Sequence, residues 1–397
     1  MNKILKGPFH NLRRIVAKLW LLAHRKVEVI GVTGSYGKTN VTAAIFTVLA
    51  EKFKVLSTDL NLDTRYNIPI TVLKLSDHQK LVLEYGVDRP GEMDYHLFVA
   101  KPKIAVITGI TPVHADSHHL GSLENIIKEK SKLAAAVPGS GWVIVNWDDH
   151  LARQIADVAR GKVIFYGRNR YHCQFWAFHI KTSFKGTSFK LHFRGTGHVV
   201  KLPLIGRHHV YTALAAATIG TLSGLRWREI ASGISKIVPL DGRGNIEPGP
   251  KESAILNDSR RANPASAVAG LQTLADLPAK RKIAVLGEMR ELGKYEEEGH
   301  RSVGRKAAET KPDYLLCVGG PTKYIADEAR RGMKKERIIF VKDVFEAAGA
   351  LSGILRKGDL WYLKGSLLAH LERIPLILEG KDVEPDEIAS QRYEVYQ

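Results

Sequence analysis

The chain has 397 residues, of which 44% are hydrophobic and 25% are charged, a composition typical of a folded globular protein rather than a disordered or fibrous one. Its length predicts about two or three domains. Lys and Arg number 59 against 41 Asp and Glu, and the formal net charge of +18 favours anionic partners. No nucleic-acid module or aromatic–basic stripe accompanies this charge, so nucleic acid is excluded as an expected partner.

Residues 1–26 carry seven Lys or Arg and no acidic residue. Three of these cations, Arg13, Arg14 and Lys18, interrupt an apolar run that is too short to span a bilayer. The segment predicts a basic amphipathic helix, which can pack against its own domain or lie on a membrane surface. We favour packing and keep membrane contact as the alternative. The apolar positions that fit one helical face are Leu12, Ile15, Val16, Leu19, Trp20 and Leu22.

The first half of the chain alternates between strand and helix patterns after residue 26. Such alternation predicts a mostly parallel α/β sheet. Residues 173–204 differ, because their alternating pattern and glycines predict a small antiparallel meander inserted in or beside that sheet. The expected strands are 27–30, 72–75, 81–85, 104–108 and 141–146, and the expected helices are 40–52, 121–137, 149–160, 209–224 and 227–236.

A glycine-rich turn at 241–244 is a hinge candidate, and the strand–helix alternation restarts after it. The second half therefore predicts a Rossmann-like, doubly wound domain. Neither Cys173 nor Cys317 has metal-ligand spacing, and both are expected to be free buried thiols. The predicted divisions are a helix at 1–26, a central domain at 27–240, a C-terminal domain at 241–385 and a polar tail at 386–397.

A phosphate-binding loop is predicted between the first strand and the first helix of the central domain. Its glycines let backbone N–H groups approach an anion closely. Lys38 can reach the β- and γ-phosphates of a nucleotide, and Thr39 can offer its hydroxyl to Mg²⁺. The strict G-x-x-x-x-G-K-[ST] spacing is not met, because Val32 occupies its first position and Gly31 stands one place earlier. The expected ATP-binding residues of the loop are Gly34, Ser35, Tyr36, Gly37, Lys38 and Thr39.

The loop sequence from Val32 to Thr39 resembles the ATP loop of the Mur ligases, the amide-forming enzymes of peptidoglycan precursor synthesis. Further motifs follow in the order in which that family has them. In the central domain these are Leu83-Glu84-Tyr85-Gly86, Arg89-Pro90-Gly91-Glu92, His114 with 120–124 and 128–130, and Gly206-Arg207-His208.

Three motifs of the C-terminal half resemble the D-alanyl-D-alanine-adding branch of the same family. They are Asp258-Ser259 with Ala262-Asn263-Pro264, Gly287-Glu288-Met289 with Glu291-Leu292-Gly293, and Lys364-Gly365-Ser366. Together with the earlier motifs they extend over residues 27–380, and the chain is identified by them as a member of the Mur ligase family.

The resemblance implies an ATP-dependent ligase that forms an amide bond through an acyl phosphate. A carboxylate attacks the γ-phosphate of ATP, and an amine then attacks the acyl carbon and displaces phosphate. The expected substrates are a small-molecule carboxylate and an amino acid or dipeptide. The catalytic residues that the resemblance implies are Lys38, Glu84, His114, Lys130 and Arg243.

Two Mg²⁺ ions are implied as cofactors besides ATP. Thr39 and Glu84 would hold the first ion with oxygen ligands, and His114 would face the second. Lys130 aligns with the lysine that family members carbamoylate with CO₂, which would make it an anionic oxygen ligand. The neighbouring Lys128 and Lys132 leave the choice of lysine open, and a plain solvated lysine run is the alternative.

The C-terminal domain is expected to complete the ATP site. Asp258 would accept hydrogen bonds from the ribose, and Arg243 would reach the γ-phosphate when the domains close and exclude water. His208 is expected among the ATP-binding residues. The residues implied for the incoming amino component are Asn263, Glu288 and Lys364.

The sequence departs from the family pattern in two places. The phosphate loop starts by residue 34, which leaves no room for the N-terminal domain that holds the UDP-sugar in full-length peptidoglycan ligases. We therefore expect the carboxylate substrate to be held differently or to be another molecule. Around adenine, His209 follows His208 where the family has asparagine, and Arg260 and Arg261 replace tyrosine and asparagine. Adenine recognition is expected to be weaker or to use other groups.

Two other functions remain open from the sequence. One is a poly-γ-glutamate- or cyanophycin-type amide ligase, which also lacks the UDP-sugar domain. The other is a membrane-associated ATP-binding scaffold without catalysis, which the retained Lys38, Glu84, His114 and Lys130 argue against. We expect a monomeric cytoplasmic enzyme, with a peripheral position at the inner face of the membrane as the alternative linked to residues 1–26.

Overall fold

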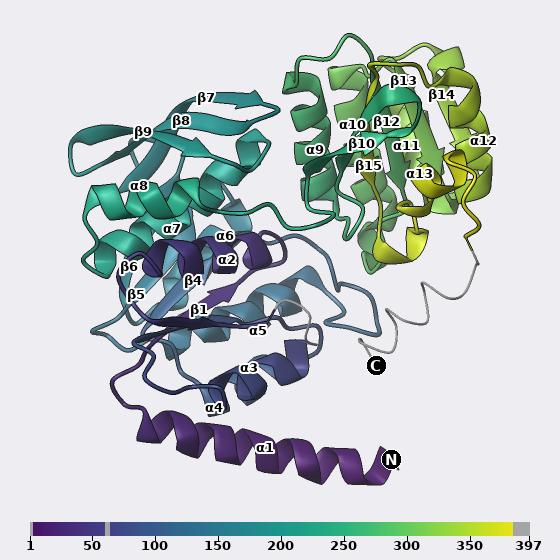
Figure 1. Cartoon of the computed structure of the whole chain (residues 1–397). Helices are drawn as coiled ribbons and strands as arrows, with labels where there is room; N and C mark the ends of the chain where they lie inside the picture. The colour runs from purple at the N-terminus through teal and green to yellow at the C-terminus, as the bar shows by residue number, and fades with distance from the viewer. Residues whose placement is uncertain (1–2, 60–63, 384–397) are drawn as a thin grey trace.

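The computed structural model describes residues 3–59 and 64–383, and the predicted tail at 386–397 lies outside them. An N-terminal helix, α1 (Lys3–Ala23), precedes two α/β domains, and the chain passes from one to the other near Leu240 (Figure 1). Glycines with positive φ, Gly242 and Gly244, form the turn at this passage.

The first domain is built on one sheet of nine strands among the described residues. The strands are β1 (Glu28–Thr33), β2 (Val55–Ser57), β3 (Lys80–Glu84), β4 (Ile104–Ile107), β5 (Trp142–Asn146), β6 (Lys162–Gly167), β7 (Phe175–Ser183), β8 (Gly186–Phe193) and β9 (Thr196–Leu202). Their order is β2-β3-β1-β4-β5-β6-β7-β8-β9. The β1 strand is an interior strand and pairs in parallel with both β3 and β4. The predicted meander is antiparallel, and it extends the same sheet from β6.

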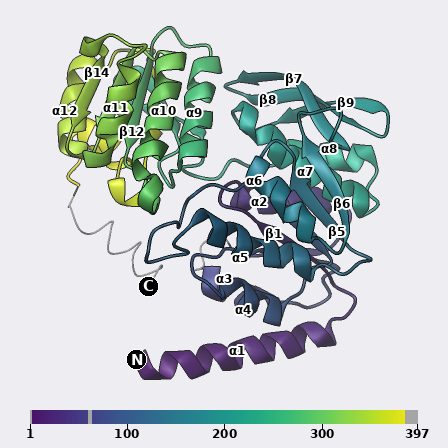
Figure 2. The same ribbon diagram turned by 180° about the vertical axis from the view of Figure 1, so that it is seen from behind.

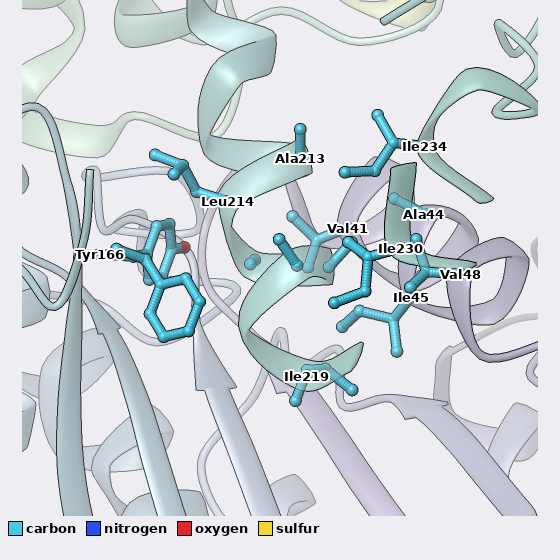
Figure 3. Packing of buried hydrophobic residues seen from close by; sticks show 14 of the residues in the cluster. Val41, Ala44, Ile45, Val48, Tyr166, Ala213, Leu214, Ile219, Ile230 and Ile234 are labelled. Carbon is cyan, nitrogen blue, oxygen red and sulfur yellow. The ribbon is translucent and has the colours of Figure 1, made fainter. Parts of the chain in front are cut away.

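Helices cover both faces of this sheet. They are α2 (Lys38–Leu49), α3 (Thr64–Val72), α4 (Glu92–Val99), α5 (Leu123–Ala136), α6 (His150–Gln154), α7 (Val210–Leu222) and α8 (Trp227–Ser235). On one face, α2, α7 and α8 pack together, with Ile45, Leu214 and Ile230 in one buried cluster (Figure 3). On the other face, α1 and α3–α6 share a second cluster that includes Ala17 and Leu133.

The second domain is a six-stranded sheet of order β10-β11-β15-β12-β13-β14. Its strands are β10 (Asn245–Gly249), β11 (Ser253–Asn257), β12 (Lys282–Gly287), β13 (Tyr314–Val318), β14 (Ile338–Val341) and β15 (Leu360–Lys364), and its helices are α9 (Pro264–Asp276), α10 (Glu296–Thr310), α11 (Lys323–Ala329), α12 (Val344–Ile354) and α13 (Arg373–Leu378). Only β10 is antiparallel to its neighbour. Separate cores on its two faces make the domain doubly wound, and the predicted fold class is confirmed.

The strand predicted at 72–75 is wrong. The segment is the end of α3 and the turn after it. Ile68, Val72 and Leu75 are buried while Leu73 is 38% exposed, which is helical spacing rather than alternation. A segment of four residues is too short to distinguish the two periods, and here the end of the helix and the turn after it bury Val72 and Leu75.

The α1 helix packs against α3 and α4, as favoured from the sequence, but the apolar positions expected on one face are mostly exposed (Figure 2). Ala17 is fully buried in the contact, and the indole N–H of Trp20 donates a hydrogen bond to the carbonyl of Leu75 at 3.1 Å. Both cysteines, Cys173 and Cys317, are free and buried, also as predicted.

Candidate active site

The phosphate loop connects β1, an interior strand of the first sheet, to α2. Gly37 is the N-cap of α2, with φ of 78°, and no side chain caps this helix end. The N–H groups of the first turn therefore point towards the loop with the positive end of the helix dipole behind them. This is the arrangement that binds phosphate at a helix N-terminus.

The loop is braced by the segment that follows β4. The Thr108 hydroxyl donates a hydrogen bond to the carbonyl of Tyr36 at 2.5 Å, and the Ser35 N–H donates to the carbonyl of Gly109 at 2.6 Å. The Tyr36 hydroxyl donates to a carboxylate oxygen of Asp149 at 2.7 Å. Burial, and then the charge of Asp149, raise the pKa of Tyr36, so its hydroxyl stays a donor. Sequence reasoning missed Thr108 and Asp149.

Replacing Gly34 with Ala is expected to distort this loop. The added Cβ would lie 2.0 Å from the Thr108 hydroxyl oxygen and 2.9 Å from the Gly109 carbonyl oxygen, at a φ of +150°. A shift of the backbone that relieves such an overlap costs about 1–3 kcal/mol. We expect ATP affinity to fall by roughly tenfold or more, measured by calorimetry. Gly195→Ala is the control, because its φ is also positive but nothing lies within 4 Å; equal affinities in the two variants would contradict the role of the collision.

Lys38 and Thr39 begin α2 beside the end of β3. Burial lowers the pKa of Lys38, although the charge of Glu84 opposes this, and its ammonium donates to the carbonyl of Gly34 at 2.9 Å. The Thr39 hydroxyl lies 3.4 Å from a carboxylate oxygen of Glu84. The register that pairs Val32 of β1 with Glu84 of β3 places the two groups at the same sheet edge. Structure and prediction therefore agree on the proximity of Lys38, Thr39 and Glu84.

Lys130 lies on α5 and is only 2% exposed. Burial, and then the charge of Lys38, lower its pKa to about 7, although Asp88, Glu129 and Glu84 act in the opposite direction. Its two neighbours differ: Lys128 is exposed, and Lys132 forms ion pairs with Asp94 and Glu129 at 2.6 and 2.8 Å. Among the three lysines, Lys130 is the one that is buried and near the phosphate loop.

His114 joins the two domains through carboxylates. Its Nδ1 lies 2.9 Å from an oxygen of Asp88, and its Nε2 lies 3.1 Å from an oxygen of Glu291 in the second domain. The Ala115 N–H donates to the carbonyl of Glu291 at 3.0 Å beside this pair. Burial disfavours the imidazolium, but the two carboxylates outweigh burial and raise the pKa of His114. Both ring nitrogens are engaged, so this arrangement leaves His114 no lone pair for a metal ion.

The His114 contact predicts a pH dependence of stability. A histidine whose pKa is raised on folding contributes fully below its ordinary value of 6.5, and the contribution is lost as pH rises through the folded value. Glu291, whose pKa His114 lowers, contributes above its ordinary value of 4.5. We therefore expect the contact to be strongest between these two values. Thermal melts of the wild type and of His114→Gln should differ most there and converge towards alkaline pH; a constant difference would contradict the ion pairs.

The second domain places a second charged pair near the first domain. The ammonium of Lys364 lies 2.6 Å from a carboxylate oxygen of Asp258. Burial lowers the pKa of Lys364, and Asp258 opposes that shift. Burial, and then the charge of Arg261, lower the pKa of Arg243, whose field also includes Asp258 and Glu84. Arg243 is therefore close enough to interact electrostatically with Glu84 of the first domain and Asp258 of the second, which agrees with its predicted place at the hinge.

The other predicted residues have partners of their own. Asn263 is the N-cap of α9 and accepts a hydrogen bond from the Ser266 N–H at 2.9 Å. Glu288 forms an ion pair with Arg290 at 2.5 Å. His208 is enclosed, and burial lowers its pKa to about 4, so its ring is neutral at physiological pH.

No three His, Cys, Asp or Glu side chains converge into a metal-binding group in the described part of the chain. The oxygen donors at the loop are instead the Thr39 hydroxyl and the Glu84 carboxylate, which are ligand types that Mg²⁺ prefers when phosphate oxygens and water complete the shell. The donor set therefore fits Mg²⁺ at this point.

A phosphate loop on a parallel sheet, facing a Rossmann-like domain across ion-paired contacts, defines a two-domain, ATP-using enzyme. Two family descriptions match the chain: the Mur ligase middle domain at residues 32–220, and the Mur ligase, glutamate ligase domain at residues 242–367. The chain belongs to the Mur ligase family, and it is an ATP-dependent acid–amino-acid ligase.

Similar proteins are found by sequence and by structure. The UDP-N-acetylmuramoyl-tripeptide–D-alanyl-D-alanine ligase of Bacillus subtilis (strain 168) is 31% identical over 87% of this chain and 75% of its own length. The enzyme of the same name from Escherichia coli (strain K12) is 32% identical over 76% of this chain and 66% of its own length. The crystal structure of MurF from Acinetobacter baumannii has a TM-score of 0.84 at 25% identity, over 94% of this chain and 81% of that one.

Proposed function

We propose that the enzyme adds D-alanyl-D-alanine, or a comparable dipeptide, to the terminal carboxylate of a peptidoglycan-precursor peptide. The observation that carries the proposal is the cluster of Lys38, Thr39 and Glu84, which lies within the electrostatic reach of Arg243 of the second domain. The names of the relatives supply the substrate class.

The reaction proceeds in two displacements. A carboxylate oxygen of the acceptor attacks the γ-phosphorus of ATP, and ADP leaves with the bridging oxygen. The amine of the dipeptide then attacks the acyl carbon, loses a proton, and displaces inorganic phosphate. Lys38 holds the β- and γ-phosphates as negative charge shifts towards ADP. The second domain covers the acyl phosphate and protects it from water.

Mg²⁺ would be held by Thr39 and Glu84, where it would neutralise phosphate charge. A role for His114 towards a second ion requires that it release Asp88 or Glu291, because both ring nitrogens hold carboxylates here. We expect this release to accompany movement of the second domain, which carries Glu291.

Lys130 is the residue that we expect to be carbamoylated. Burial lowers its pKa to about 7, so a substantial fraction of its amine is neutral near this pH and can attack the carbon of CO₂. The new N–C bond forms as one C=O pair moves to oxygen, and the nitrogen loses a proton to solvent. The resulting carbamate is an anion in place of the amine, and the nearby Lys38 would stabilise it.

In the second domain, Asp258 would accept hydrogen bonds from the ribose while it keeps its ion pair with Lys364. Arg243 would contact the γ-phosphate. The neutral ring of His208 is expected to pack near the nucleotide. Lys364 and Glu288 are the expected contacts of the dipeptide. Asn263, the N-cap of α9, would contribute to the same site by holding the start of that helix.

The test is phosphate release from ATP, screened over pairs of carboxylate and amine. The expected result is release that requires both UDP-N-acetylmuramoyl-tripeptide and D-alanyl-D-alanine, with the joined product detected by mass spectrometry. Release that requires a glutamate chain instead would favour the poly-γ-glutamate-type alternative. Absence of amine-dependent release with every pair would favour the scaffold. As a user of ATP, the enzyme is expected in the cytoplasm, and we expect it to be a monomer.

A further inference from the structure

The α1 helix packs on the first domain with its apolar face outwards. Ala17 is fully buried on the inner side of the helix, and Leu21 packs against the same core one turn further on, but the apolar residues of the opposite side are exposed. Leu12 is 58% exposed and Leu19 is 60% exposed. The exposed apolar residues of the helix, here called the outward stripe, are Leu12, Ile15, Val16, Leu19, Trp20 and Leu22. They extend over about 15 Å of helix.

Two cations take part in the contact that holds α1, beside the buried Ala17 and Leu21. The guanidinium of Arg14 lies over the ring of Tyr95 at 4.5 Å, and the ammonium of Lys18 lies over the ring of Phe98 at 4.1 Å. An amphipathic surface helix normally buries its apolar face against the core. The outward stripe is therefore not explained by packing within the chain.

The surroundings of the stripe are positively charged. Residues 1–26 contain seven Lys or Arg and no acidic residue. Arg25 and Lys26, directly after the helix, are exposed. Tyr95 and Phe98, beneath Arg14 and Lys18, are 54% and 45% exposed. An apolar stripe that includes a tryptophan and is flanked by cations is the chemistry that binds an anionic lipid surface.

A second copy of the chain fits this surface less well. Two α1 helices meeting stripe to stripe would bring two sets of seven cations together, and residues 1–26 offer no acidic side chain to pair with them. None of the described helices is long and apolar enough to cross a bilayer, so the helix would lie in the plane of the interface.

We propose that α1 docks the enzyme on anionic lipid, with the outward stripe in the acyl boundary and the flanking cations at the headgroups. In Figures 1 and 2, α1 forms the outer edge of the first domain, away from the second domain. Docking through this edge leaves the contact between the two domains uncovered. The proposal does not depend on the identity of the ligase substrates.

The test is flotation of the full chain with vesicles of phosphatidylcholine alone and of phosphatidylcholine with phosphatidylglycerol. We expect binding to the anionic vesicles only. Ile15→Glu with Leu19→Glu should weaken binding by roughly a hundredfold, because two aliphatic side chains no longer enter the lipid. The matched control is Val199→Glu, which replaces an aliphatic residue that is 66% exposed on β9.

Charge is tested separately. Arg25→Glu with Lys26→Glu should weaken binding at least about thirtyfold, since each cation near an anionic surface contributes roughly a fivefold factor. Lys201→Glu, an exposed lysine on β9, is its control. ATP binding in each variant reports that the first domain is folded. The proposal would be overturned by equal binding to neutral and anionic vesicles, or by unchanged binding of the Ile15→Glu, Leu19→Glu variant. It would also be overturned if the wild type bound no vesicles but formed a dimer that this double substitution dissociates.

Discussion

Replacing Lys38 with Ala is expected to lower turnover by about a hundred- to a thousandfold or more. Its ammonium is the cation at the mouth of the phosphate loop, 2.9 Å from the carbonyl of Gly34, and removal of one preorganised charge from a water-excluded site has this scale of effect. The measurement is amine-dependent phosphate release at saturating ATP.

The control for this variant is Lys52→Ala. Lys52 lies just beyond the other end of the same helix, where its ammonium donates to the carbonyl of Gly224 at 2.8 Å. We expect it to retain the activity of the wild type. Unchanged turnover in Lys38→Ala would refute the assignment of the loop to ATP.

Replacing Lys130 with Gln is expected to remove both the carbamate and most of the activity. Gln keeps a side chain of similar length but has no amine to react with CO₂, and about a hundredfold loss of turnover is expected for an anionic group that positions charge in the site. In the presence of ¹³C-labelled bicarbonate, the wild type should give a carbamate carbon signal by NMR and Lys130→Gln should not.

Lys132→Gln is the matched control on the same helix. Burial alone would lower the pKa of Lys132, but its ion pairs with Asp94 and Glu129 outweigh burial and raise it. The amine therefore stays protonated and unreactive towards CO₂. The variant should keep the carbamate signal. A signal that persists in Lys130→Gln and disappears in Lys132→Gln would move the assignment to the other lysine.

Features that depend on residues close together in the chain were mostly predicted from the sequence. The strand, loop and helix around Lys38 follow from a local pattern, and parallel pairing of the next strand brings Glu84 to the same edge. The wrong strand at 72–75 and the missed helix α4 (Glu92–Val99) have the same cause, because short segments do not show their period.

The parts of the candidate site that were not predicted depend on contacts between residues far apart in the sequence. Asp149 supports Tyr36 from 113 positions away, and in the sequence it reads only as a helix cap. The pairing of His114 with Glu291 depends on how the second domain meets the first, which no local pattern encodes. Burial distinguishes Lys130 from Lys128 and Lys132. This burial results from the packing of α5 against the sheet, which the local sequence does not show.

The acyl-phosphate route is tested most directly by isotope transfer. The carboxylate substrate that supports turnover is labelled with ¹⁸O in its terminal carboxyl group, and the phosphate released is examined by mass spectrometry. Attack of that carboxylate on the γ-phosphate of ATP predicts one ¹⁸O atom in each phosphate released together with the amide product. Phosphate without the label, alongside amide formation, would contradict the account.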